Sequence, residues 1–245
     1  MSSKRTLLAL LVAALFFCVG CGDLPGRPKV DSIPIDPDKM MDFAVLFGKN
    51  CSGCHGAEGR RGAALSIGDP VYLAIADDSI LRKAVTDGIA GTSMPAFARS
   101  AGGMLTDDQV SVIIRGIREH YSKPNALAGS APPSYASSDS GDAAHGAAVF
   151  NSFCASCHGP AGKGGAKAGS IVDASFLSLL TDQELRTLVI VGRPDLGAPD
   201  WRSNVPGKPM SSQEISDVVA WFSAQRTQVA TRPIPNAAKP AGALP

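Results

Sequence analysis

Apolar side chains recur at helical spacing near the end of two separate stretches of the chain. In each stretch they occupy positions i, i+3, i+4 and i+7, which share one face of an α-helix. These residues are Val110, Ile113, Ile114 and Ile117, and then Ile215, Val218, Val219 and Phe222. A hydroxyl residue with Gln or Glu three positions later, a pattern typical of a helix N-terminus, precedes each set at Thr106 and Ser211. The pattern predicts one amphipathic helix at the end of each stretch.

Shorter helices are predicted upstream in both stretches. Two of them cover residues 42–50 and 141–153. Two others begin at polar caps, Asp77 and Thr181, and end at glycines, Gly88 and Gly192. No segment alternates apolar and polar residues for long, as a half-buried strand would. The predicted fold class is therefore all-α.

The two stretches are copies of one another, about 104 residues apart. Each contains Phe-x-x-x-Cys-x-x-Cys-His-Gly, beginning at Phe47 and at Phe150. Further matching pairs are Asp69 with Asp173, Leu81 with Leu185, Arg82 with Arg186, Gly88 with Gly192, and Pro95 with Pro199. The sequence therefore predicts two small tandem modules, over residues 42–121 and 141–226.

Segments without helical periodicity surround these modules. Residues 21–41 are rich in proline and predict an extended tether, while residues 122–140, rich in Ser, Pro and Ala, predict a linker. A free linker of this length would behave as a random coil spanning about 24 Å. Residues 227–245 form a Pro/Ala-rich tail. We therefore expect all three segments to lie outside the helical modules.

The first 20 residues have the pattern of an export signal. Lys4 and Arg5 precede an apolar run that is too short to span a bilayer comfortably. The run ends in small residues beside Cys21, which resembles the signal of a bacterial lipoprotein, although Cys18 occupies the position where leucine is usual. We therefore expect removal of residues 1–20, lipidation of Cys21 and anchoring of the exported protein to a membrane surface.

Composition restricts the kind of partner. The chain of 245 residues is 18% charged with a formal net charge of +1, so it lacks the basic footprint of a nucleic-acid-binding protein. It contains 26 glycines and 18 prolines, and much of its backbone is therefore expected to be loop. Modules of about 80 residues rarely bury enough apolar surface unaided, so a cofactor at the centre of each is expected.

The repeated Cys-x-x-Cys-His sequence is the attachment motif of c-type haem. On a helical turn its three side chains share one face and can address one flat ligand. The cysteines at 51 and 54, and at 154 and 157, would form thioether bonds, while His55 and His158 would each bind iron. The candidate attachment residues are Cys51, Cys54, Cys154 and Cys157. A structural zinc site would bring four ligands to one module, which neither copy offers. The motif thus predicts two covalently bound haem c groups.

With these motifs, each module resembles a class I cytochrome c domain and the pair resembles a diheme cytochrome c. The resemblance implies two small all-α domains, each wrapped around haem, and a methionine as distal iron ligand on a loop before the last helix. In the first module Met94, followed by Pro95, matches that loop. Met104, next to the last helix, is expected to have a packing role instead.

The second module departs from this pattern. Ala198 stands opposite Met94, and its one methionine, Met210, stands opposite Leu105. Two interpretations remain open: either the loop brings Met210 to the iron, which we favour, or Met210 packs and the iron has an open or different distal position. His120 and His145 are expected to be surface residues.

An iron with histidine and methionine as axial ligands exchanges electrons with little rearrangement, so we expect an electron-transfer protein and no enzyme activity of its own. The resemblance extends to lipoprotein cytochrome subunits of respiratory complexes such as alternative complex III. It implies redox proteins or a membrane respiratory complex as partners, a lipid-anchored location in the periplasm or on the outer face of a membrane, and no small-molecule substrate. The alternative is an enzyme resembling diheme peroxidases, with Ala198 leaving the second haem open.

Overall fold

A computed structural model describes residues 35–226. The predicted signal with Cys18, the candidate lipidation site Cys21, most of the tether and the tail 227–245 lie outside these residues. The contacts of the chain divide after Met40. Before that boundary the structure describes one short 3-10 helix, η2 (Pro37–Lys39). From Met41 onward the chain forms a second unit that contains both modules.

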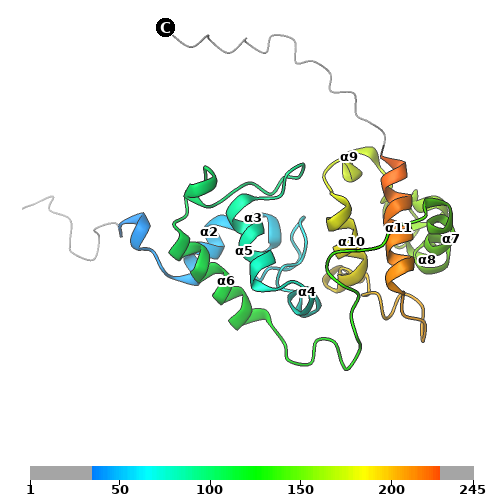
Figure 1. The fold of residues 1–245 in the computed structure, drawn as a ribbon, viewed down its shortest axis with the longest axis horizontal. Helices are drawn as coiled ribbons and strands as arrows, with labels where there is room; N and C mark the ends of the chain where they lie inside the picture. Colours follow the sequence, from blue (N-terminus) through cyan, green and yellow to red (C-terminus); the bar gives the residue numbers. More distant parts are fainter. Residues whose placement is uncertain (1–34, 227–245) are drawn as a thin grey trace, which may run out of the picture. The chain divides into compact units, whose positions relative to one another are not determined.

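Both modules are helical (Figure 1). The first module contains α2 (Phe43–Asn50), α3 (Ser52–His55), α4 (Pro70–Ile75), α5 (Asp78–Asp87), η3 (Arg99–Ala101) and α6 (Asp107–Tyr121). The second contains α7 (Ala143–Phe153), α8 (Ala155–His158), η4 (Pro160–Gly162), α9 (Ala174–Leu177), α10 (Asp182–Val191), η5 (Pro194–Leu196) and α11 (Ser212–Gln225). Between residues 35 and 226 β-pairing is limited to two isolated bridges. The all-α prediction is confirmed.

Side-chain caps explain where the longer helices begin. The side chains of Thr106 and Ser211 each accept a hydrogen bond from the backbone N–H three residues on. The side chains of Gln109 and Glu214 in turn accept one from the backbone N–H of Thr106 and Ser211, which completes the predicted capping boxes of α6 and α11. The helices α5 and α10 end at Gly88 and Gly192, both at positive φ, as expected. The short helices α4 and α9, which we did not predict, are capped by aspartates of the repeat, Asp69 and Asp173.

The last helix of each module supplies the predicted apolar face to the core. All eight side chains of the two faces are buried: Val110, Ile113, Ile114, Ile117, Ile215, Val218, Val219 and Phe222. This helix crosses the first helix of its module at a glycine, but the glycine changes sides between the copies. Gly116 of α6 lies against the ring of Phe43, whereas Gly146 of α7 lies against the backbone of Asp217 and Cβ of Trp221. At this crossing one helix carries a glycine and the other a large side chain, and the two modules place the glycine on opposite helices of the pair.

In each module one arginine binds two backbone carbonyls and one aspartate, but the two arginines stand at different positions of the repeat. Arg118 of α6 donates to the carbonyls of Leu73 and Ala76 and pairs with Asp78. In the second module Arg226, which comes directly after α11, makes the corresponding contacts. It donates to the carbonyls of Leu177 and Leu180 and pairs with Asp182, the three counterparts of the first set. Because the two arginines are not equivalent in the repeat, aligning the copies does not reveal this likeness.

The second half of the predicted linker is bound to the second module. The guanidinium of buried Arg186 donates from Nε and Nη2 to the carbonyl of Ser134, at 3.1 and 3.0 Å. Gln183 donates to the carbonyl of Tyr135 at 2.8 Å, and the hydroxyls of Ser137 and Ser216 lie 2.9 Å apart. A random coil therefore does not describe this part of the chain.

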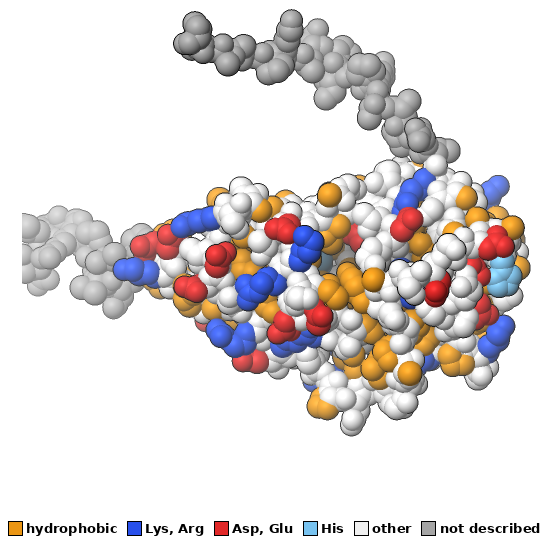
Figure 2. All heavy atoms as spheres, in the orientation of Figure 1, with side chains coloured by type: hydrophobic (Ala, Val, Ile, Leu, Met, Phe, Trp, Pro, Cys, Tyr) orange, Lys and Arg blue, Asp and Glu red, His pale blue; other side chains and the backbone are white. Residues whose placement is uncertain are grey.

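The distribution of charge on the surface agrees with the formal net charge of +1. On the face drawn in Figure 2, Lys and Arg side chains are interspersed with Asp and Glu, without a field of one sign. Among residues 35–226, no helix combines the length and the apolar character needed to cross a membrane.

Candidate functional site

Each Cys-x-x-Cys-His motif folds as one tight helical turn. Cys51 lies between α2 and α3, and its carbonyl accepts hydrogen bonds from the backbone N–H groups of Cys54 and His55, at 3.2 and 3.0 Å. In the second module the carbonyl of Cys154 accepts the same two bonds from Cys157 and His158, at 3.1 and 3.0 Å. None of the four cysteines of these turns, all within residues 35–226, forms a disulfide. The turn thus presents two thiols and one imidazole within five residues.

His55 is buried and held by a backbone carbonyl. Its Nδ1 lies 2.7 Å from the carbonyl oxygen of Leu65. Since a carbonyl can only accept, Nδ1 carries the proton and Nε2 keeps its lone pair. Burial also lowers the pKa of His55, which favours the neutral imidazole that binds a metal. The side chain is therefore a neutral imidazole with a free Nε2, the form in which histidine can bind a metal.

His158 has the equivalent contact in a looser form. Its Nδ1 lies 3.2 Å from the carbonyl oxygen of Gly169, and the ring is only half-buried. Burial raises the pKa of Cys154 to about 11, as it does for Cys51 in the first module. In both modules, two thiols and an imidazole with a free Nε2 are the donor set that a c-type haem requires, so the residues present fit this group.

The loop after the first motif folds back on it. The backbone N–H of Ala64 donates to the carbonyl of Cys54 at 3.0 Å, and a Cβ on Gly62 would come within 2.1 Å of the same oxygen. This close approach requires glycine at position 62. The loop carries Leu65, whose carbonyl orients His55. The sequence analysis did not find this carbonyl, because a backbone acceptor leaves no side-chain signal.

Met94 lies half-buried on the loop between α5 and η3. Its backbone N–H donates to Oγ1 of Thr92 at 3.1 Å, and its carbonyl accepts from the N–H of Ile89 at 3.0 Å. Gly88, at a φ of 70°, lets the backbone of Met94 and Pro95 pass close to the end of α5. The methionine thus sits on a loop fixed at both sides.

The structure confirms that Ala198 is the counterpart of Met94. The carbonyl of Ala198 accepts from the N–H of Arg193 at 2.9 Å, as that of Met94 does from Ile89. Gly192 lies against Ala198 and Pro199 as Gly88 lies against Met94 and Pro95. The loop is therefore conserved in shape between the copies but carries a methyl group where the first module has a thioether.

Met210 occupies the position of Leu105. Its N–H donates to the carbonyl of Trp201 at 2.9 Å, as the N–H of Leu105 does to the carbonyl of Phe97 at 2.8 Å. The side chain is 3% exposed, and Nδ2 of Asn204 lies 3.9 Å from its sulfur. If Met210 binds the iron, it does so from a different position in its module than Met94.

The other candidate side chains lie on the surface. Met104 is 80% exposed, so the expected packing role is wrong. His120 is exposed, stacks on the ring of Phe43 and has its Nδ1 2.8 Å from the carbonyl of Gly116 in its own helix.

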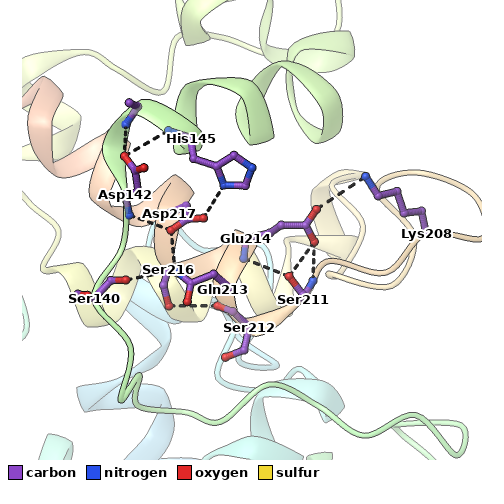
Figure 3. A network of polar contacts seen from close by, with 11 residues as sticks. Ser140, Asp142, His145, Lys208, Ser211, Ser212, Gln213, Glu214, Ser216 and Asp217 are labelled. Carbon is purple, nitrogen blue, oxygen red and sulfur yellow. Dashed lines mark hydrogen bonds and ion pairs between the residues drawn. The ribbon is translucent and has the colours of Figure 1, made fainter.

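His145 and Asp217 form an ion pair between α7 and α11 (Figure 3). Nδ1 of His145 lies 2.6 Å from Oδ2 of Asp217, and the side chains are 56% and 2% exposed. The hydrogen bond to Asp217 raises the pKa of His145, and the charges of Asp142 and Glu214 act in the same direction. Burial opposes charge on Asp217, but hydrogen bonds from the Asp142 N–H, from His145 and from Gln213 outweigh it and lower its pKa.

This pair is expected to make the stability of the second module depend on pH. Because the pKa of His145 is raised, its contribution is complete below the ordinary value of 6.5 and is lost as pH rises through the raised value. Because the pKa of Asp217 is lowered, its contribution is complete above 3.8 and is lost as pH falls through the lowered value. Denaturation between about pH 5 and about pH 9 should show stability falling with pH above 6.5.

His145→Gln should remove this decline, whereas His120→Gln should leave it in place, because the ring of His120 bonds to the uncharged backbone carbonyl of Gly116. An unchanged decline in His145→Gln would show that another group is responsible.

Comparison with known proteins gives the family. The profile described as cytochrome c oxidase, cbb3-type, subunit III matches residues 38–115 and 141–222. Two proteins named Cbb3-type cytochrome c oxidase subunit CcoP are each 30% identical to the chain. The one from Azospirillum sp. (strain B510) aligns over 157 residues, 58% of this chain and 48% of the relative. The one from Cereibacter sphaeroides aligns over 149 residues, 55% and 45%. The match thus spans less than half the length of these relatives.

Among solved structures, a chain of the reducing HAO-like protein complex of Kuenenia stuttgartiensis covers 84% of this chain and 100% of its own length. Its TM-score is 0.45 and its sequence identity 14%, which do not establish a shared fold. The profile, in contrast, matches each module separately and covers more than half of the chain. Both matched ranges contain a complete Cys-x-x-Cys-His turn. The chain therefore belongs to the family of the cytochrome c oxidase, cbb3-type, subunit III.

Proposed function

We propose that this protein is a diheme c-type cytochrome that passes single electrons within a respiratory oxidase complex. The observation that carries the proposal is the presence, in both modules, of a Cys-x-x-Cys-His turn whose histidine has its Nδ1 occupied by a carbonyl. The relatives are named as oxidase subunits, which favours an oxidase over a quinol-oxidising complex such as alternative complex III.

The residues divide the work as follows. Cys51 and Cys54 would hold the first haem, while Cys154 and Cys157 would hold the second. His55 and His158 would supply the proximal nitrogen, and Met94 the distal sulfur of the first site. A bound haem supplies a one-electron ferric/ferrous couple, and methionine ligation raises its potential.

The protein side of this chemistry is to limit rearrangement. The Leu65 carbonyl holds the imidazole of His55 in one orientation, and the bonds of Met94 to Thr92 and Ile89 hold the distal loop. Because both sides of the first site are fixed before an electron arrives, few atoms need to move when it leaves. Such a site suits electron transfer better than substrate turnover.

We propose Met210 as the distal ligand of the second haem because it is the one methionine of that module and its sulfur is buried. Ala198 favours a second candidate function, a peroxidase-like enzyme, because it leaves no side-chain ligand at the position of Met94. The two candidates differ in whether the second iron binds added ligands.

The test uses the full-length haem-loaded protein. Haem analysis should give two haems per chain, and both should be reduced and reoxidised without turnover of peroxide. Carbon monoxide added to the reduced protein should leave both haem spectra unchanged. Rapid binding at one haem together with peroxide turnover would establish the second candidate instead, and fewer than two haems would contradict the diheme proposal.

We also propose that the protein is exported and anchored to a membrane through lipid on Cys21, by the sequence pattern of residues 1–21. The intact mass of the membrane-extracted protein decides this, since it must equal a chain beginning at Cys21 plus two covalently bound haems and acyl groups. A mass that includes Met1 would contradict it.

A further inference from the structure

The second module inserts an ion pair into the loop that orients the first proximal histidine. Arg193 and Asp195 flank the start of η5 and form two parallel hydrogen bonds, each 3.0 Å long. Their side chains are only 15% and 6% exposed. The hydrogen bond from Arg193 is the main reason that the pKa of Asp195 lies far below its ordinary value, so the pair is charged at neutral pH.

Both members of this pair bind the first module directly. Oδ2 of Asp195 accepts from the backbone N–H of Arg61 at 2.7 Å and from Oγ of Ser66 at 2.9 Å. Nη2 of Arg193 donates to the carbonyl of Gly62 at 2.9 Å. All three partners belong to the short loop 61–66 that follows the first Cys-x-x-Cys-His turn.

This loop is the one that holds His55. Leu65, next to Ser66, accepts the hydrogen bond from Nδ1 of His55, and Gly62 lies against the carbonyl of Cys54. The loop is therefore fixed on one side by the haem-attachment turn and on the other by Arg193 and Asp195. Partners that orient a ligating histidine also set its basicity and the properties of the metal.

The pair is not part of the repeat. In the first module the counterparts of Arg193 and Asp195 are Ile89 and Gly91, which carry no charge. The matching backbone bonds, from Ile89 to Met94 and from Arg193 to Ala198, show that the loops otherwise agree. The two charges are thus specific to the copy that faces the proximal loop of its neighbour.

We propose that Arg193 and Asp195 are positioning residues for the first haem, through which the second module orients His55 and sets the potential of that haem. The proposal rests on the proposed haem occupancy of both modules. Ferric haem carries one more positive charge than ferrous haem, so a nearby carboxylate favours the ferric form and a guanidinium the ferrous form. In the intact pair these influences oppose each other.

Because the two charges act on the potential in opposite directions, removing them one at a time distinguishes this proposal from a merely structural contact. Asp195→Asn leaves the guanidinium uncompensated and should raise the potential of the first haem. Arg193→Gln leaves the carboxylate uncompensated and should lower it. The double variant should return towards the wild-type value. Redox titration of the full-length haem-loaded protein measures these shifts, and the wave that moves in Met94→Ala is that of the first haem.

Two controls separate the pair from general changes of charge. Lys83→Gln and Asp87→Asn make the same charge changes in the first module at a pair that is 79% and 48% exposed, and should move the wave little because water screens them.

Ser66→Ala removes a neutral donor to Asp195 and should shift the wave in the same direction as Arg193→Gln, by less. This variant keeps the test available if either charge variant fails to fold.

Shifts of the same sign in Asp195→Asn and Arg193→Gln would overturn the proposal. So would shifts no larger than those of the exposed control pair, or shifts confined to the second haem. Absence of haem from either module, in contrast, would contradict the proposed function and is measured separately by haem content.

Discussion

Replacing Cys51 and Cys54 together by alanine is expected to remove one of the two haems and to unfold most of the first module. Between His55 and Pro70 this module has no helix, and the backbone there returns to the motif through Gly62 and Ala64. A module of about 80 residues with such a segment lacks the apolar core to order it unaided. Haem content should fall from two to about one per chain, and helical signal in circular dichroism should fall with it.

The matching change, Cys154→Ala with Cys157→Ala, should remove the other haem and leave the spectrum of the first. Ser52→Ala, between the two cysteines, should keep both haems, because its hydroxyl donates to the carbonyl of Gly48 in the preceding helix and is not part of the attachment motif. Retention of two covalently bound haems in the double variant of the first module would contradict the assignment of these thiols.

The helices could be predicted because their signals are local. The capping boxes at Thr106 and Ser211, and the glycines at 88 and 192, act within a few residues of the helix ends that they fix. Apolar spacing then identified the buried face of the last helix. The short helices α4 and α9 escaped because six and four residues are too few to show a helical period.

The site could be predicted only where side chains carry the chemistry. The motif cysteines and histidines were evident, but the carbonyls of Leu65 and Gly169 that orient the histidines were not. The contact of Asp195 with Ser66 joins positions 129 residues apart, and no pattern in one sequence indicates such a pairing. The equivalence of Arg118 and Arg226 was hidden because they differ in their place relative to the last helix.

Met94→Ala is expected to abolish the iron–sulfur charge-transfer band of the first haem and to lower its potential. The thioether is a ligand that raises the potential, and alanine offers no donor in its place. The loop itself should survive, because its bonds run through the backbone of Met94 and through Thr92. Near-infrared absorption of the ferric protein and a redox titration measure both effects. Met104→Ala is the matched control, since that methionine is 80% exposed and should leave the band unchanged.

The size of the loss in Met94→Ala also identifies the distal ligand of the second haem. If Met210 ligates iron, each haem contributes to the band, so Met94→Ala removes about half of it and Met210→Ala removes the remainder. If Met210 only packs, as Leu105 does at the same place in the first module, Met94→Ala removes the band entirely and Met210→Ala leaves it intact. The second result would mean that Ala198 leaves the second haem without a methionine ligand, and carbon monoxide should then bind that haem in the wild-type protein.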